Sequence, residues 1–248
     1  MNDHSKFRLG KLSAVAAPHI PTIGRYAALA PLPEPPAEVD WTNRIDWPLL
    51  ANDHVGDCTV AGVLHAIQCA ERWRDGVGRA GTDAQAIYGY STVSAYPASD
   101  NGAVIADVMA HWRDVGFNVP GGPNQILSYV RVEPAHLRTA LWMLGPVIIG
   151  VQLPIAAQQQ SDWKAPATLD GDNAPGSWGG HRVVIARMDA DGGVWLVTWG
   201  KLVHADAGWL AAYMDEAWSP VQPAWLAAGK SPSGILATAI SESMGVAV

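Results

Sequence analysis

The sequence predicts an α+β protein whose N-terminal half is helical and whose C-terminal half is an antiparallel sheet. Between residues 58 and 145, apolar residues recur at the i, i+3, i+4, i+7 spacing of amphipathic helices. After Gly145, β-branched and aromatic runs bounded by turn residues replace that spacing. A chain of 248 residues, 49% of them hydrophobic, is long enough to bury one sizeable core. We therefore expect one compact domain with extended ends.

The helical half is expected to begin at or just before Cys58 and to run first to about Arg74, because Val60, Val63 and Leu64 share one face. Thr82 and Gln85 then have the spacing of a capping box. Further helices are expected over residues 82–94, 104–116, 134–145 and 209–217.

The sheet half contains three clear strand patterns, over residues 146–153, 181–188 and 194–199. The turn Asp191-Gly192-Gly193 predicts that the last two form a hairpin. The polar loop at residues 155–179 is long enough to be functional. The domain organisation expected is a Pro-rich N-terminal arm (1–38), in which residues 31–36 favour polyproline II, then the folded domain (39–218) and a C-terminal tail (219–248).

Composition argues against several classes of partner. The net charge of −7 comes from 23 acidic and 16 basic residues, and the basic residues form no run, so a nucleic-acid or anionic-lipid footprint is not expected. No window of about twenty apolar residues predicts a membrane span. The apolar stretch at residues 12–17 is too short and too Ala-rich for a secretory signal peptide, so we expect a soluble cytosolic product.

The two cysteines, Cys58 and Cys69, are predicted to lie about 16 Å apart on one helix, at roughly 1.5 Å per residue. That separation is beyond disulfide reach, so both thiols should be free. Cys69, mid-helix among apolar residues, is expected to be structural.

Cys58 is the candidate nucleophile, because a helix N-terminus lowers the pKa of a thiol. His181, which follows two glycines and starts a strand, is the best-placed base, and those glycines would leave room for a substrate backbone. His54 and His65 are alternatives closer in sequence. Asp57, if it points inward, would raise the thiol pKa.

A family resemblance rests on several segments in the right order. Val39-Asp40-Trp41 and the stretch Asn-Asp-His-Val-Gly-Asp-Cys at residues 52–58 resemble the start of a mature papain-family peptidase. In that family a Val-Asp-Trp segment precedes Gln-x-x-x-Gly-x-Cys, with the same spacing of amide, glycine and cysteine. Gly145-Pro146-Val147 resembles its Gly-Pro-Val strand, and residues 180–185 and 194–197 resemble its catalytic-histidine strand and the strand after it.

The resemblance implies a papain-like fold in which the nucleophile helix packs on an antiparallel sheet or half-barrel. It implies Cys58 as nucleophile, His181 as general base and acid, and Asn52 as an oxyanion donor together with the Cys58 backbone N–H. The family orients its histidine with an asparagine, but the aligned stretch here offers only Thr198 to hydrogen-bond the ring or Trp199 to cover it. Catalytic activity is therefore left open.

The motifs at residues 52–58, 176–181 (Gly-Ser-Trp-Gly-Gly-His) and 197–200 (Val-Thr-Trp-Gly) also resemble papain-like proteins encoded by bacteriophages and prophages of high-GC hosts. Two functions follow. One is a phage cysteine hydrolase that cleaves an amide bond of peptide or peptidoglycan through a thioester. The other is a catalytically inactive virion component that binds other virion proteins through its arms and tryptophans. A homo-oligomer is compatible with both, and the resemblance implies a location in the phage virion or the bacterial cytoplasm.

No cofactor or metal is expected. Residues 53–58 offer only half of a zinc site, and the Gly-rich turns lack the Lys of a phosphate-binding loop. Asp170-Gly171-Asp172-Asn173 lacks the distal Glu of an EF-hand loop.

Overall fold

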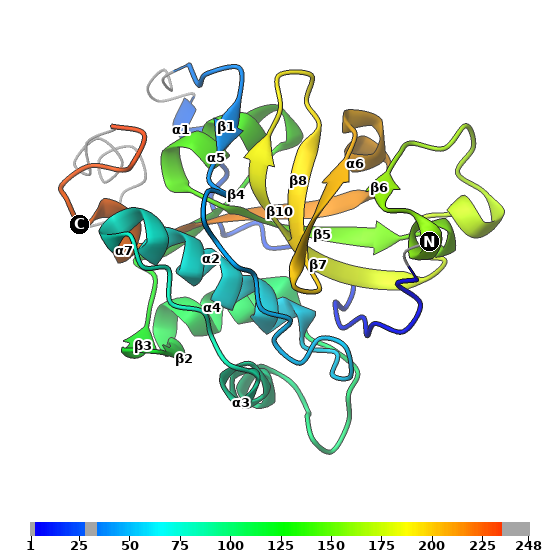
Figure 1. The fold of residues 1–248 in the computed structure, drawn as a ribbon, viewed down its shortest axis with the longest axis horizontal. Helices are drawn as coiled ribbons and strands as arrows, with labels where there is room; N and C mark the ends of the chain where they lie inside the picture. The colour runs from blue at the N-terminus through cyan, green and yellow to red at the C-terminus, as the bar shows by residue number, and fades with distance from the viewer. Residues whose placement is uncertain (1–2, 28–33, 235–248) are drawn as a thin grey trace.

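The protein folds into a sheet with helices on both faces (Figure 1). The computed structural model describes residues 3–27 and 34–234. The α-helices are α1 (Ile23–Ala27), α2 (Cys58–Asp75), α3 (Asp83–Val93), α4 (Ile105–Asp114), α5 (Leu137–Leu144), α6 (Ala207–Tyr213) and α7 (Pro223–Leu226). Short 3₁₀ turns are η1 (Pro134–His136), η2 (Ile155–Gln159) and η3 (Gly171–Asn173). The strands are β1 (Val39–Asp40), β2 (Phe117–Val119), β3 (Gly122–Asn124), β4 (Ser128–Arg131), β5 (Val147–Leu153), β6 (Asp162–Trp163), β7 (Gly179–Met188), β8 (Val194–Thr198), β9 (Lys201–Ala205) and β10 (Met214–Val221).

The main sheet has the strand order β4-β10-β5-β7-β8-β9-β6, and β1 pairs with β7. Its pairs are antiparallel except β6 with β9. The predicted hairpin is confirmed, because β7 and β8 pair across the turn at residues 189–193. β2 and β3 form a separate hairpin.

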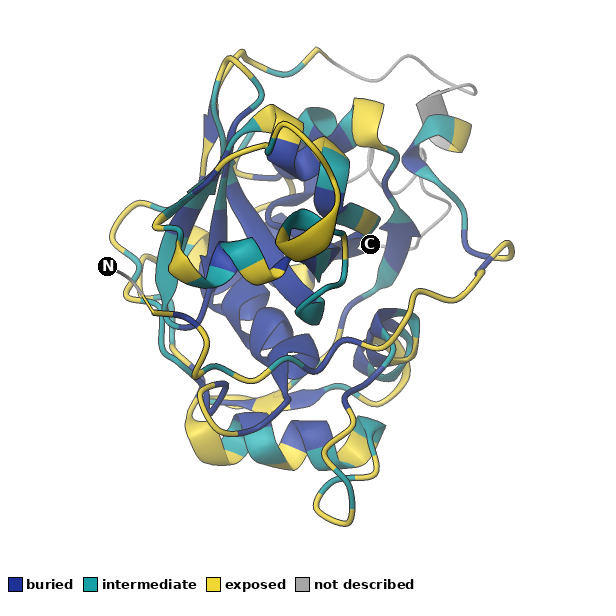
Figure 2. Ribbon diagram, turned by 90° about the vertical axis from the view of Figure 1, so that its right-hand side faces the viewer, coloured by how far each residue is buried: buried dark blue, intermediate teal, exposed yellow. Residues whose placement is uncertain are grey.

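Both faces of the sheet are buried, which explains the continuous apolar runs of β5 and β7. Side chains alternate between faces along a strand. Val184 and Ala186 of β7 pack with α2, α3 and α4, whereas Val183 and Ile185 pack on the opposite face with α5 and α6. Figure 2 shows buried residues gathered in the sheet and in the helix that lies against it. That helix, α2, is the element that carries Cys58.

The helix predictions around the candidate nucleophile are confirmed. α2 begins at Cys58 and ends at Asp75, before Gly76 in the left-handed conformation. Thr82 and Gln85 form both hydrogen bonds of the capping box. Both cysteines lie on α2 and are free.

Three expectations need correction. The helix expected to reach Ala217 ends at Tyr213, because Met214 already pairs with Val151 in the sheet. Residues 219–221, expected to open the tail, belong to β10. The helix from Pro134 starts as a 3₁₀ turn, η1, and becomes α-helical at Leu137.

Pro220 is tolerated in β10 because the strand is paired on only one side there. β10 pairs with β5 only up to Trp218, and beyond that residue only with β4. The missing N–H of a proline can then face the side that has no partner strand. Residues 28–33, which include part of the predicted polyproline run, lie outside the described residues.

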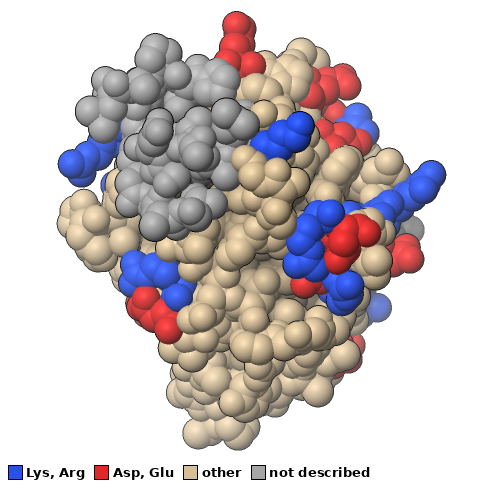
Figure 3. All heavy atoms as spheres, turned by 90° about the vertical axis from the view of Figure 1, so that its left-hand side faces the viewer, with Lys and Arg blue, Asp and Glu red and all other residues tan. Residues whose placement is uncertain are grey.

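Charges on the face seen in Figure 3 lie in small mixed groups of both signs, separated by uncharged surface. Within the described ranges, no helix is both long and apolar enough to cross a membrane.

Candidate active site

Cys58 is the first residue of α2 and is buried, with 1% of its surface exposed. The turn before it is fixed by Asp100, whose carboxylate accepts a hydrogen bond from the Gly56 N–H at 3.0 Å. Tyr90 donates its hydroxyl to the same carboxylate at 2.9 Å. The thiol therefore sits on a fixed first turn, where unpaired backbone N–H groups favour a negative charge.

Burial dominates the ionisation of Cys58 and raises the pKa of its thiol to about 11. Hydrogen bonding from the backbone of Arg182 and Gly10 opposes this rise in pKa, as does the Arg182 charge. In this arrangement the thiol is neutral at pH 7, so a helix N-terminus alone does not activate it.

Asp57 is fully buried beside Cys58, and within the described part of the chain neither of its carboxyl oxygens has a hydrogen-bond partner. Burial raises the pKa of Asp57 to about 8. The carboxyl is therefore mostly protonated at pH 7, which removes most of the repulsion that it would exert on a thiolate.

His181 is the third residue of β7 and is also buried. Its Nε2 lies 2.7 Å from the hydroxyl oxygen of Thr198, and its ring stacks on Trp199 with a centroid distance of 4.6 Å. Burial lowers the pKa of His181 to about 3, so the imidazole is neutral. A hydroxyl can donate or accept, so Thr198 fixes the ring position but allows either tautomer.

The second nitrogen of His181, Nδ1, has no hydrogen-bond partner among residues 3–27 and 34–234, Cys58 included. Cys58 nevertheless borders the same small hollow as Thr198 and Trp199, the two residues in contact with the imidazole. This hollow of about 10 Å³ has room for no more than one water molecule. The structure thus brings the thiol close to the residues that hold His181 without a direct sulfur–nitrogen bond.

Asn52 is buried two residues after Leu50 and one after Ala51, both of which have positive φ. Its side-chain amide donates to the carbonyl of Val55 at 3.1 Å and to the carbonyl of Arg8 at 3.5 Å. Arg8 belongs to the N-terminal region, so this amide is already hydrogen-bonded to the backbone of that region.

Two other histidines considered as bases have different environments. His54 is exposed, and its Nδ1 lies 2.6 Å from the Asp53 carboxylate. His65 is buried, its Nε2 lies 2.8 Å from the carbonyl of Pro48, and burial lowers its pKa to about 4. His65 borders the same hollow as Cys58, but its Nε2 is already engaged.

A segment at the N-terminus, residues 4–12, covers this site, and we call it the covering segment. In Figure 1 it is the dark-blue chain that passes the start of α2 and the start of β7. Lys11 donates its backbone N–H to the carbonyl of Gly180 at 3.2 Å, next to His181. Gly10 accepts from the N–H of Ala103 at 2.9 Å, and Leu12 donates to the carbonyl of Ala103 at 3.0 Å.

Glycines make this close contact between backbones possible. A Cβ at Gly10 would lie 1.6 Å from the carbonyl oxygen of Gly56. A Cβ at Gly102 or Gly180 would lie 2.3 Å from the carbonyl oxygen of Gly10 or Lys11, respectively. The site is therefore shaped to hold an extended backbone between the helical side and the sheet.

The covering segment also contacts the aromatic cover of the histidine. Phe7 stacks on the Trp199 indole with a centroid distance of 5.0 Å, and the same indole stacks on the His181 ring. His4 lies 5.2 Å from Trp199 between ring centroids. The imidazole, the indole and the covering segment thus form one aromatic stack.

Comparison with solved structures places this arrangement in a known architecture. Xylellain, a cysteine protease from Xylella fastidiosa, superposes with a TM-score of 0.67 at 17% identity, over 90% of this chain and 98% of that one. ProCathepsin B S9 from Trypanosoma congolense gives 0.61 at 11% identity, over 88% of each chain. The Amb a 11 cysteine protease, a major ragweed pollen allergen, in its proform gives 0.58 at 16% identity, over 81% of this chain and 73% of that one.

This chain has the papain-like fold. The sequence itself matches no protein-family model and no curated protein. At these identities the similarity establishes the fold, and the roles of individual residues depend on the geometry described above.

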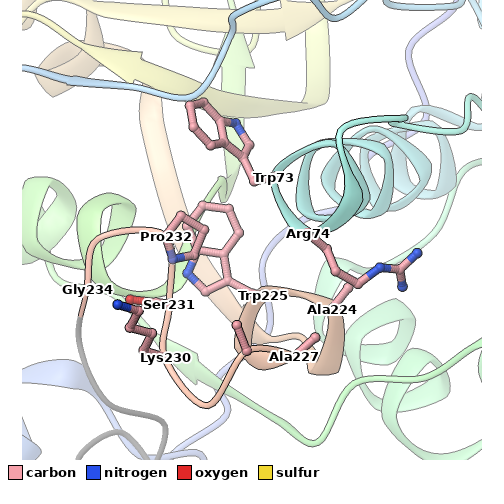
Figure 4. Close-up of a pocket in the computed structure, with 10 residues that line it drawn as sticks. Trp73, Arg74, Ala224, Trp225, Ala227, Lys230, Ser231, Pro232 and Gly234 are labelled. Carbon is pink, nitrogen blue, oxygen red and sulfur yellow. The ribbon is translucent and has the colours of Figure 1, made fainter.

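A larger hollow of the papain-like fold lies away from Cys58. It measures about 390 Å³ and lies between the end of α2 and α7, where Trp73, Trp225 and the turn at residues 230–234 line it (Figure 4). None of its lining residues is a cysteine or histidine. It therefore offers no nucleophile and base of the kind found around α2 and β7.

The sequence analysis missed three features of the site: the covering segment, the buried Arg182 next to Cys58, and the acidic pair Asp215 and Glu216 discussed below. Gly10 within an otherwise bulky stretch, Phe-Arg-Leu-Gly-Lys-Leu, is the one local signal that the chain makes a close approach there.

Proposed function

We propose that the protein is a cysteine hydrolase that cleaves an amide bond of a peptide or a peptidoglycan cross-link, with Cys58 as nucleophile. One observation carries this proposal: the thiol on the first turn of α2 borders the same hollow as Thr198 and Trp199, which hold the His181 ring. The cysteine proteases among the structures that share the fold support the same class of reaction.

In the proposed reaction, His181 Nδ1 takes the thiol proton and the Cys58 sulfur attacks the carbonyl carbon. The Asn52 amide and the Cys58 backbone N–H donate to the carbonyl oxygen as it becomes negative. The C–N bond breaks, His181 gives its proton to the leaving amine, and a thioester remains. Water then loses a proton to His181 and attacks the thioester, which releases the acid and returns the proton to the sulfur.

The covering segment makes the described state a closed one. Gly10 packs against the carbonyl of Gly56, two residues before Cys58, and the Arg8 carbonyl accepts a hydrogen bond from the Asn52 amide, so a substrate can enter only after the segment moves. Its departure would also admit water to Cys58 and remove much of the burial that raises the thiol pKa.

The test compares Cys58→Ser with Cys69→Ser in hydrolysis of a protein substrate, a mixed peptide library and purified peptidoglycan. Cys69 is a matched control, because it is a second buried thiol on α2 whose sulfur lies 3.6 Å from the carbonyl of Trp41, a contact that a serine hydroxyl can keep. Cys58→Ser should lower hydrolysis by at least about a thousandfold. Both variants are also measured with Lys11→Met added, a change that loosens the covering segment. Equal rates for the two variants in that background would refute the proposed hydrolase.

A second candidate is a non-catalytic virion component, favoured by the neutral buried thiol and by Thr198 in place of an amide that orients the histidine. It would act in assembly within the phage particle. Mass spectrometry of purified particles tests it, and absence of the chain from the particles would refute it.

A further inference from the structure

We propose that the acidic pocket that holds Lys11 selects a basic side chain of the substrate, an inference that rests on the proposed hydrolase. The pocket is formed by Gly150 and Gln152 of β5 and by Asp215 and Glu216 at the start of β10, where the two strands pair. In the closed state Lys11 occupies it, and its side chain has no exposed surface.

The contacts of Lys11 are those of a built binding site. Its Nζ lies 2.8 Å from Asp215 Oδ2 and 3.3 Å from Glu216 Oε1. Two carboxylates around one ammonium offset the free-energy cost of removing that charge from water.

Both carboxylates are held in place by other residues. Gln152 donates its amide to Asp215 Oδ2 at 2.6 Å, and the Trp218 indole N–H donates to Glu216 Oε2 at 2.7 Å. Asp215 and Glu216 are therefore oriented toward the pocket by partners that do not belong to the covering segment. This preorganisation is independent of Lys11.

Room for the lysine stem comes from Gly150. A Cβ at this position would lie 2.2 Å from Lys11 Cε and 2.6 Å from Asp215 Oδ1. An alanine at residue 150 would thus block the pocket, whereas glycine leaves a channel the width of an aliphatic stem.

The backbone connects this pocket to the reacting atoms. Gly10, adjacent to Lys11, packs against Gly56, two residues before Cys58, and the Lys11 N–H bonds to Gly180, adjacent to His181. A substrate backbone that follows the same path puts one side chain into the acidic pocket beside the bond under attack. The matching substrate is a peptide with lysine or arginine at that position.

The first experiment measures how the pocket holds the covering segment in the full chain. Iodoacetamide labelling of Cys58 is followed by peptide mapping, with Cys69 as internal reference. Lys11→Met and Asp215→Asn should each speed labelling of Cys58 at least about tenfold, because each breaks a buried ion pair, whereas Lys11→Arg should keep it slow. The control is Lys6→Met, an exposed residue of the same segment. Unchanged labelling in Lys11→Met would overturn the inference.

The second experiment offers the pocket a ligand in trans. The Lys11→Met protein is labelled in the presence of the nine-residue peptide that copies residues 6–14, and of versions with Arg, Leu or Glu at the Lys11 position. The Lys and Arg peptides should protect Cys58 at concentrations about tenfold lower than the Leu and Glu peptides, and Asp215→Asn should abolish the difference. Equal protection by the Lys and Leu peptides would refute a basic-specific pocket.

The outcomes separate this inference from the proposed function. Selective protection by basic peptides, without any hydrolysis that depends on Cys58, would support the basic-specific pocket and refute the proposed hydrolase. Hydrolysis that depends on Cys58 but proceeds equally well with Leu and Lys peptides would support the proposed hydrolase and refute the basic-specific pocket.

Discussion

Asp57 and Cys58 are neighbouring acids that the fold keeps neutral by the same means, burial. The pKa of Asp57 rises to about 8 and that of Cys58 to about 11. Because Asp57 is neutral, it places no negative charge beside the Cys58 thiol, and both pKa shifts fit the closed state of the site. The free energy of unfolding should therefore depend on pH.

We predict that Asp57→Asn raises the stability of the closed protein at pH 8 more than at pH 4. In the unfolded chain Asp57 ionises with an ordinary carboxyl pKa near 3.8, whereas in the folded chain it stays protonated to about pH 8. The folded state then binds more protons in this window, so stability falls as pH rises from about 4 to about 8, by up to roughly 1.4 kcal/mol per unit.

Urea unfolding of both proteins at intervals across this window measures the effect. The wild-type curve alone does not isolate Asp57, because His181, whose pKa is lowered to about 3, contributes the opposite slope as pH falls below about 6.5. The difference between the two proteins does isolate it. A difference that stays constant from pH 4 to pH 8 would show that Asp57 is not buried as a neutral acid.

Among the elements, α3 connects the two loops that border the site on the helical side. The Tyr90 hydroxyl of this helix donates to Asp100, which fixes Gly56, and accepts from the N–H of Gly102 at 2.8 Å. Gly56 and Gly102 are two of the glycines against which the covering segment lies. One phenol therefore holds both loops on the helical side of the site.

We predict that Tyr90→Phe lowers the free energy of unfolding by about 1–3 kcal/mol, because it leaves the Gly102 N–H without its partner in a buried site. The control is Tyr88→Phe on the same helix, where the residue is 59% exposed and the loss should be under about 0.5 kcal/mol. Urea unfolding at one pH measures both variants. Equal losses for the two would show that the Tyr90 hydroxyl does not hold these loops.

The elements that could be predicted from the sequence are those with local signals. Apolar spacing placed α2 and its start at Cys58, the Thr82–Gln85 pair placed α3, and the turn after Asp189 placed the β7–β8 hairpin. β10 was missed because the spacing of Trp209 to Ala217 fits a helix, and only pairing with β5 draws Met214 into the sheet. Tertiary pairing decided this segment against its local pattern.

The site was predictable to a similar degree. Local sequence and family resemblance pointed to Cys58, His181 and Asn52, with Thr198 and Trp199 beside the histidine. The pairing of Lys11 with Asp215 joins residues 204 positions apart, and no local pattern marks either one. The covering segment is fixed by backbone contacts to glycines, which become visible only when the two sides of the site are assembled.

At the scale of the whole molecule, the covering segment bridges the helical and sheet sides by being part of the same chain. A tethered segment acts at an effective concentration that reaches the millimolar range for short flexible linkers, so weak contacts suffice to keep the site closed. Residues 13–16 are exposed, Val15 by 49%, which makes the stretch just beyond the segment accessible to a protease.

We predict that a single cut at residues 13–16 turns closure into a bimolecular equilibrium. After the cut the segment remains bound only through its own contacts, so labelling of Cys58 by iodoacetamide should become faster on dilution, whereas in the intact chain it is independent of concentration. Mass spectrometry first confirms the single cut, and labelling is then followed from micromolar to nanomolar protein. Lys11→Arg should keep this dilution behaviour, because its guanidinium can still pair with Asp215 and Glu216. If cut protein at nanomolar concentration stays as protected as the intact chain, the contacts of residues 4–12 alone hold the site closed, and tethering is not what keeps the thiol covered.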